Sequence, residues 1–248
     1  GPYETGAEAR AAVLLQQALD SDPREATRWE TAASALLKAG HPQQAVAVAE
    51  EGRLLFPGRP ALLRTLAAAK LRLNENEAAR THYQAALQNL EEDGGPDSTR
   101  AALYAGLGRA HGQLDQPHRA TEAFETALRL DRNQPTALVH YALRLAEQSS
   151  DRALTLAKRA VSAHPSSPAA HAALGWVTFN RGAAAKAKRH FRDAIEAGPA
   201  PAWVYEKFGD LYQALGNDRR AQQYWKKALD RAPNRDALQN KLDALPNS

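Results

Sequence analysis

Residues 202–235 read AWVYEKFGDLYQALGNDRRAQQYWKKALDRAPNR, and residues 168–201 directly before them read PAAHAALGWVTFNRGAAAKAKRHFRDAIEAGPAP. A shift of 34 positions superimposes the two stretches at matching residue types: Gly175 on Gly209, Gly182 on Gly216, Ala187 on Ala221, Phe191 on Trp225, Ala194 on Ala228 and Pro199 on Pro233. A repeat of about 34 residues is typical of helix-turn-helix units, each too small to bury its apolar face alone. The sequence therefore predicts a stack of helical hairpins.

One alanine position carries this period through the whole chain. It is occupied by Ala11, Ala45, Ala79, Ala120, Ala153, Ala187 and Ala221, with steps of 34, 34, 41, 33, 34 and 34 residues. Because the spacing is nearly constant, we expect the repeat to organise nearly all of the 248 residues.

Within a unit, the residue types suit two packed helices and a tight turn. Ala221 and Ala228 lie seven residues apart and share a helix face, where small side chains let a neighbouring helix approach while Trp225 fills the space beside it. Gly216 can adopt the left-handed backbone conformation that ends many helices. Prolines such as Pro168 suit the first turn of a helix, where the missing amide hydrogen costs nothing.

This pattern resembles the tetratricopeptide repeat. Residues 202–235 carry the family's signature as Tyr205, Phe208, Gly209, Tyr212, Gly216, Ala221, Trp225, Ala228 and Pro233. The resemblance implies an all-α fold, a right-handed superhelical solenoid of antiparallel helix hairpins that forms a single domain over residues 7–248. Six full repeats are expected at 26–59, 60–93, 101–134, 135–167, 168–201 and 202–235.

Both ends of the array depart from the full repeat. Residues 7–25 match a second helix without its first, so we expect a half repeat whose apolar side could pair with a second copy of the chain. Residues 236–245 predict a capping helix, with Leu238 facing the core and Lys241 facing solvent.

Two steps in the period differ from the others. The step of 41 places seven extra residues between two units, and their acidic, Gly- and Pro-containing sequence predicts an inserted surface loop at about residues 91–100. The step of 33 shortens the turn before Asp151, where a Ser-Ser-Asp sequence at 149–151 is expected to cap the following helix.

The composition excludes several classes of protein. The chain is 44% hydrophobic and 24% charged, which is typical of a folded domain, and it contains no apolar stretch that could span a membrane. It has no cysteine, which rules out disulfides, thiolate metal sites and cysteine nucleophiles. It also has no Met and begins with Gly1 and Pro2, which we interpret as the remnant of a cleaved tag.

Charge is distributed unevenly along the chain. Residues 1–150 carry 16 Lys+Arg and 19 Asp+Glu, whereas residues 151–248 carry 16 and 9. The basic half could attract an acidic partner, and the alternative is that these charges only solvate the outer surface. A basic run from Arg181 to Arg192 lacks interleaved exposed aromatics, so a solvated helix face is favoured over a nucleic-acid site.

The resemblance to the family implies a binding surface on the concave side, at the second, fifth, ninth and twelfth positions of each first helix. These positions share one helix face. In this chain they include Arg64, Arg109, Val139, Leu143, Trp176, Phe179, Trp203, Glu206 and Asp210. Because the fold does not require apolar side chains there, the five apolar members predict a groove for an apolar segment of a partner protein. The alternative is that Trp176 and Trp203 simply pack against each other.

No enzyme motif accompanies the repeats. Gly106, Gly108 and Gly112 miss the dinucleotide-binding spacing and lie in a predicted helix without a preceding strand. The eight histidines are scattered among different units, so we expect no catalytic residue, no metal site and no cofactor.

The leading functional interpretation is therefore a non-catalytic interaction scaffold or adaptor that binds a protein or peptide segment. One alternative is a bacterial cell-envelope, secretion or exopolysaccharide assembly protein, and another is the regulatory repeat region of a larger enzyme. The Ala- and Arg-rich composition favours a bacterial chain in the cytoplasm or periplasm, with no transmembrane segment and no nucleic-acid partner.

Overall fold

The computed structural model describes residues 25–148, 150–232 and 236–245, and every regular element within these ranges is a helix. The chain divides into two compact units, Gly1–Ala137 (unit 1) and Leu138–Ser248 (unit 2). The predicted tag remnant and all but the last residue of the predicted half repeat lie outside the described residues.

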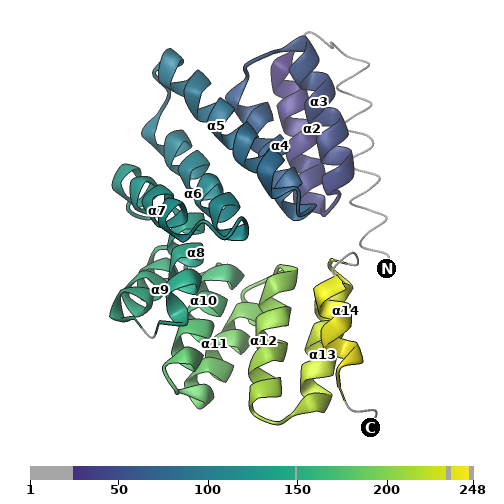
Figure 1. Cartoon of the computed structure of the whole chain (residues 1–248), viewed down its shortest axis with the longest axis vertical. Coiled ribbons are helices and arrows are strands. Elements are labelled where there is room, and N and C mark those ends of the chain that lie inside the picture. Colours follow the sequence, from purple (N-terminus) through teal and green to yellow (C-terminus); the bar gives the residue numbers. More distant parts are fainter. Residues whose placement is uncertain (1–24, 149, 233–235, 246–248) are drawn as a thin grey trace. The chain divides into compact units, whose positions relative to one another are not determined.

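The helices follow one another in pairs, as the 34-residue period predicts (Figure 1). Unit 1 contains α2 (Ala26–Ala39), α3 (Pro42–Leu55), α4 (Pro60–Arg72), α5 (Asn76–Asp93), α6 (Asp97–Gln113) and α7 (Pro117–Leu130). The boundary between the units falls in α8 (Pro135–Ala146), and unit 2 continues with α9 (Asp151–Ala163), α10 (Pro168–Asn180), α11 (Ala184–Glu196), α12 (Ala202–Ala214), α13 (Asp218–Leu229) and α14 (Asp236–Asp243). The all-α helical solenoid is thereby confirmed.

Successive hairpins are joined by contacts of a second helix with the next first helix, such as α3 with α4 and α5 with α6, and also by contacts between first helices. In unit 1, α2 contacts α4 and α4 contacts α6, and in unit 2, α10 contacts α12. Among the described residues, no comparable contact joins one second helix to the next. The first helices therefore line one side of each unit, which is the side on which the sequence predicts binding.

The turns within hairpins use left-handed residues. Gly40, Gly182 and Gly216 have φ values of 94°, 81° and 71°, which confirms the conformation predicted for Gly216. Two hairpins without a glycine at this point use Asn74 (φ 62°) and Asp115 (φ 54°) instead. Short polar side chains tolerate this region better than most others do.

Helix starts also follow the sequence. Pro42, Pro60, Pro117, Pro135 and Pro168 each occupy the first position of a helix. At the shortened turn, the Ser150 hydroxyl accepts a hydrogen bond from the Arg152 backbone N–H at 3.2 Å, so serine does cap α9.

Close packing within a hairpin depends on a glycine that faces an aromatic ring. The pairs are Gly108 with Phe124, Gly175 with Phe191 and Gly209 with Trp225. A Cβ atom added to Gly108 would lie only 2.8 Å from Cδ1 of Phe124. The three rings are 2%, 0% and 0% exposed, so each fills the space that its glycine leaves open.

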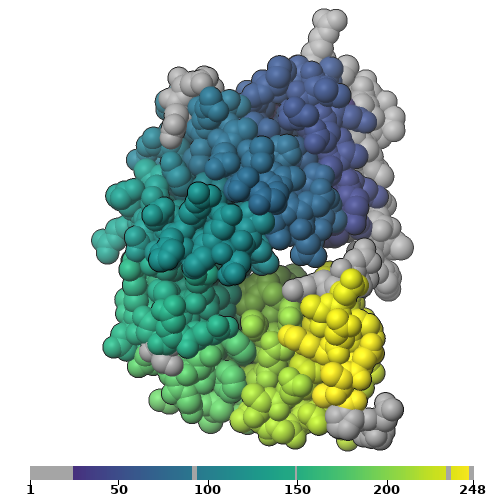
Figure 2. All heavy atoms as spheres, viewed as in Figure 1, coloured from purple at the N-terminus to yellow at the C-terminus, as the bar shows by residue number. Residues whose placement is uncertain are grey.

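The core of unit 2 extends to the C-terminal helix. One apolar cluster includes Phe208 of α12, Trp225 of α13 and Leu238 of α14, all fully buried. The side chains of these helices form one continuous packed body in the space-filling view (green to yellow, Figure 2). The burial of Leu238 confirms the inward orientation predicted for its side chain.

The prediction of an inserted loop over about residues 91–100 is wrong. Helix α5 continues to Asp93 and α6 begins at Asp97, so the extra residues lengthen these two helices to 18 and 17 residues. Gly94, with φ 68°, ends α5, and the Gly95 N–H donates to the Leu90 carbonyl at 3.0 Å. Glutamates are good helix formers, which favours continuation of α5 up to the glycine.

We predict opposite effects for the same substitution at two positions of α6. Gly108→Ala should lower the free energy of unfolding by about 1–3 kcal/mol, because its Cβ would press on the buried Phe124 ring. Gly112→Ala is the matched control: no atom lies within 4 Å of a Cβ at this exposed helical glycine. It should leave stability unchanged or raise it by up to about 1 kcal/mol, because alanine favours the helix. Urea denaturation followed by circular dichroism measures both, and equal effects would contradict the packing role of Gly108.

Candidate functional site

The nine predicted groove residues are distributed over both units. Arg64 on α4 and Arg109 on α6 belong to unit 1 and are exposed and partly buried, respectively. The other seven belong to unit 2. The prediction places Val139 of α8 in the groove, but this residue is 3% exposed and therefore belongs to the core. Leu143, one turn further along α8, is partly buried.

Two aromatic residues of α10 form the centre of the unit 2 surface. The rings of Trp176 and Phe179 lie 5.5 Å apart between centroids and are tilted by 37°. Both are partly buried and pack against the core cluster that is shared with α12. Aromatic side chains with one packed and one open side can accept a further apolar group.

Trp203, on the neighbouring first helix α12, pairs with a different ring. Its indole lies 6.2 Å from the imidazole of His140 on α8, measured between centroids. Among the described residues, no ring contact joins Trp203 to Trp176. The alternative considered from the sequence, that the two tryptophans pack against each other, stays a prediction, since both lie against the same core cluster.

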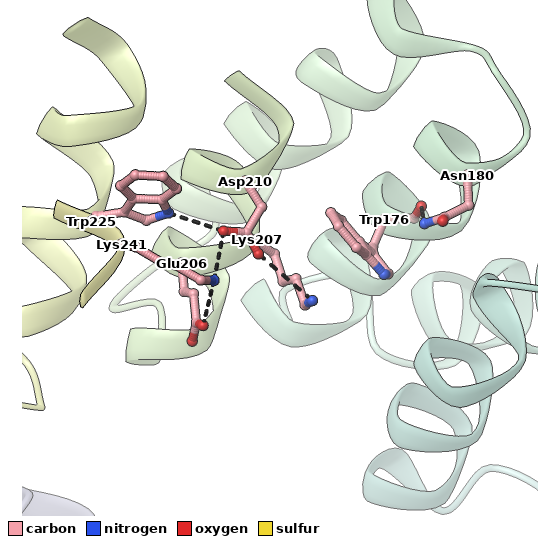
Figure 3. A network of polar contacts seen from close by, with 7 residues as sticks. All are labelled: Trp176, Asn180, Glu206, Lys207, Asp210, Trp225 and Lys241. Atoms are coloured by element: carbon pink, nitrogen blue, oxygen red, sulfur yellow. Dashed lines mark hydrogen bonds and ion pairs between the residues drawn. The ribbon is translucent and has the colours of Figure 1, made fainter. Parts of the chain in front are cut away.

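Polar groups border the α10 aromatics. The Lys207 ammonium lies 4.0 Å from the centroid of the Trp176 ring, which is a cation–π distance. On the same helix as Trp176, the Asn180 amide donates to the Trp176 carbonyl at 2.9 Å. Figure 3 shows Lys207 between Asp210 and the Trp176 indole.

The C-terminal helix completes this border with a cation. Lys241 of α14 donates to Glu206 at 2.9 Å and to Asp210 at 2.8 Å, so its predicted outward orientation is wrong (Figure 3). Asp210 also accepts a hydrogen bond from the Trp225 indole N–H at 3.0 Å. The second Asp210 oxygen lies 3.7 Å from the Lys207 ammonium. Two carboxylates on α12 are thus matched by two ammonium groups.

The electrostatics of Lys241 follow from these contacts. Burial alone would lower the pKa of Lys241, but the hydrogen bonds and charges of Asp210 and Glu206 outweigh it, so the pKa is raised. The carboxylate side chains are only 17% and 13% exposed. Because solvent screens such pairs incompletely, the lysine remains a fixed cation of the site.

The sequence does not reveal Lys207 and Lys241 as parts of this surface. Lys207 falls between two of the predicted groove positions on α12, and Lys241 lies on the helix expected only to cap the core. The sequence signal that could have pointed to these lysines is charge complementarity, because the carboxylates of Glu206 and Asp210 share a helix face and require a cation nearby.

Other site classes find no geometric support in the described residues. No group of three or more His, Asp or Glu side chains there could hold a metal ion. In the same residue ranges, no helix has the length and apolar character needed to cross a bilayer. The arrangement combines aromatic surface with compensated charge, which suits contact with another protein.

Comparison with known proteins agrees with this architecture. Three family models, each described as a tetratricopeptide repeat, match residues 59–133, 143–201 and 204–235. No curated protein matches the chain in sequence.

Several solved structures share the fold. The Cut9–Hcn1 hetero-tetramer of the APC/C has a TM-score of 0.70 at 17% identity, covering 97% of this chain and 46% of that chain. A tetratricopeptide repeat protein from Parabacteroides merdae ATCC 43184 has a TM-score of 0.66 at 17% identity, covering 98% of both chains. PilW, a type IV pilus biogenesis factor, has a TM-score of 0.59 at 22% identity, covering 88% of this chain and 98% of that chain.

The chain thus spans less than half the length of the Cut9–Hcn1 chain, and at these identities the likeness concerns the fold. The family matches, the period of the sequence and the paired helices all agree: this chain belongs to the tetratricopeptide repeat family.

Proposed function

We propose that unit 2 binds an apolar segment of a partner protein against a surface formed by Trp176, Phe179 and Trp203. The repeats and their similarity to other tetratricopeptide repeat proteins support an interaction scaffold in general. Repeats of this fold are typically non-catalytic, and we propose no catalytic step. The finer assignment rests on one observation: three partly exposed aromatics share the first-helix side of unit 2.

The size and stiffness of these side chains favour binding. A tryptophan offers a large contact area with few rotatable bonds, so little conformational entropy is lost when a partner covers it. Trp176 and Phe179 are already held by each other and by the core, which further reduces the ordering cost. An apolar side chain of the partner would occupy the open side of this pair.

The charged border limits what the partner must supply. Glu206 and Asp210 are matched by Lys241 and Lys207 from within the chain, so a partner does not need a basic side chain to satisfy them. Lys207 is shared between Asp210 and the Trp176 ring and can shift when a partner displaces it. The proposed contact is therefore apolar at its centre and polar at its edge, as in many transient interfaces.

We predict that the double variant Trp176→Ala/Phe179→Ala loses partner capture. Affinity capture from an extract of the native host, followed by mass spectrometry, compares this variant with the wild type and with Leu215→Ala. Leu215 is 43% exposed at the end of α12, so the control removes apolar surface of the same unit from another place. Circular dichroism should show the same helicity for all three proteins. Equal recovery of the same partner by the double variant and the wild type would reject the proposal.

We also predict that Lys241→Gln lowers the free energy of unfolding by about 1–2 kcal/mol. The substitution removes the cation that two mostly buried carboxylates share, although Asp210 keeps its contacts with Lys207 and the Trp225 indole. The effect is smaller than for a fully buried pair because the Lys241 side chain is 32% exposed. Lys226→Gln, at an exposed position of α13, serves as the charge-matched control and should change stability by less than about 0.5 kcal/mol.

The pH dependence of the Lys241 effect has a defined sign. Because the folded pKa is raised, the stabilisation is fully present below the unfolded lysine value of about 10.4 and is lost as the pH rises through the folded pKa. The difference between wild type and Lys241→Gln should therefore stay constant from about pH 7 to 9 and shrink at higher pH. Urea denaturation at several pH values measures it, and a difference that grows above pH 10 would contradict this assignment.

A further inference from the structure

A second feature lies in unit 1, on helices α4 and α6. These helices carry five basic residues: Arg64, Lys70, Arg72, Arg100 and Arg109. Lys70 pairs with Glu75 at 2.6 Å, and Arg100 pairs with Asp97. Within the described ranges, the other three arginines form no ion pair with a carboxylate.

These three arginines lie on two neighbouring first helices, close to one buried phenol. Tyr83 of α5 is 3% exposed, and a Cβ atom added to Gly106 of α6 would lie 2.7 Å from its hydroxyl oxygen. Arg109 follows Gly106 by one helical turn, and α4, which carries Arg64 and Arg72, contacts α6 directly. The first-helix side of unit 1 thus carries the three arginines on two helices in contact, and one of these helices, α6, lies against the Tyr83 hydroxyl.

The pKa values agree with this placement. Burial raises the pKa of Tyr83, while the charges of Arg109, Arg64 and Arg72 act against that rise. Burial lowers the pKa of Arg109, and burial together with the charge of Arg109 lowers the pKa of Arg72. No carboxylate contributes to any of these shifts, so the positive charge is uncompensated, and the protonated Tyr83 hydroxyl stays available as a hydrogen-bond donor.

The cluster is open to a ligand. Arg64 and Arg72 are exposed, and Arg109 is partly buried beside them, so the donors lie at different depths of one surface. Arg72 is oriented in addition by a hydrogen bond from its guanidinium to the Leu37 carbonyl near the end of α2. The cluster is also not a consequence of a generally basic region, because residues 1–150 have more acidic than basic side chains.

We propose that Arg64, Arg72 and Arg109, together with the Tyr83 hydroxyl, bind the phosphoryl group of a phosphate monoester. A phosphate monoester carries close to two negative charges and three acceptor oxygens, which matches three guanidinium groups and one phenol better than a single carboxylate does. The phosphoryl group belongs either to a phosphorylated side chain of a partner segment or to a small free phosphate. This site is separate from the apolar surface of unit 2 and does not depend on the function proposed for it.

The test is a titration of the full chain with three probes, followed by isothermal calorimetry and by amide chemical shifts in NMR. The probes are inorganic phosphate, N-acetyl-phosphoserine amide and acetate. We expect both phosphate probes to bind and acetate to bind at least about tenfold more weakly, because it lacks the second charge. Tighter binding of the phosphoserine probe identifies a phosphorylated segment as the source, and tighter binding of inorganic phosphate identifies a small free phosphate.

Variants assign the binding to this cluster. Arg109→Gln should weaken phosphate binding by about tenfold or more, the effect of losing one charge-assisted hydrogen bond. It should not destabilise the protein in phosphate-free buffer, because it removes an uncompensated buried charge. Arg119→Gln, at an exposed position of α7, is the matched control and should bind phosphate like the wild type. Arg64→Gln, at an exposed position within the cluster, provides a second variant if Arg109→Gln does not fold.

Three results would overturn the proposal: no binding of either phosphate probe, equal binding of acetate and phosphate, or an equal loss in Arg109→Gln and Arg119→Gln. Because the probes are small molecules, none of these results depends on the partner capture proposed for unit 2. A failure of either proposal can therefore be recognised separately.

Discussion

The contact between a helical glycine and a buried aromatic ring controls how closely the two helices of a hairpin approach. It recurs as Gly108 with Phe124, Gly175 with Phe191 and Gly209 with Trp225. Because the ring occupies the space above the glycine, the second helix is held at a fixed distance and the first helix keeps its opposite face free. Both candidate surfaces, the aromatic one in unit 2 and the basic one in unit 1, are built on faces that this contact leaves available.

Most of the fold could be predicted from the sequence because the period, the glycines and the prolines all act locally. Helix starts at proline and helix ends near Gly182 and Gly216 agree with the structure. The extra residues near Gly94 were harder to place, since acidic residues beside glycine fit a loop as well as a lengthened helix. The turns at Asn74 and Asp115 carry no glycine, so sequence inspection does not single out these residues.

The candidate surfaces could be predicted only in part. Repeat positions place Trp176 and Phe179 on a shared helix face, because the spacing of a regular helix determines which residues are neighbours. The spacing cannot tell how deeply a position is covered, and Val139 is consequently a core residue. Contacts between distant helices, such as Lys241 with Glu206, depend on how the last helix docks, which a repeat pattern does not specify.

Helix α14 does more than cover apolar side chains of the core. Lys241 lies where the first helix of a further repeat would contact α12. Its ammonium group forms ion pairs with Glu206 and Asp210 there. Helix α14 is therefore held electrostatically as well as by apolar packing. An engineered chain that continues the repeats past α13 would have to provide an equivalent ammonium or guanidinium group, or else replace both acids.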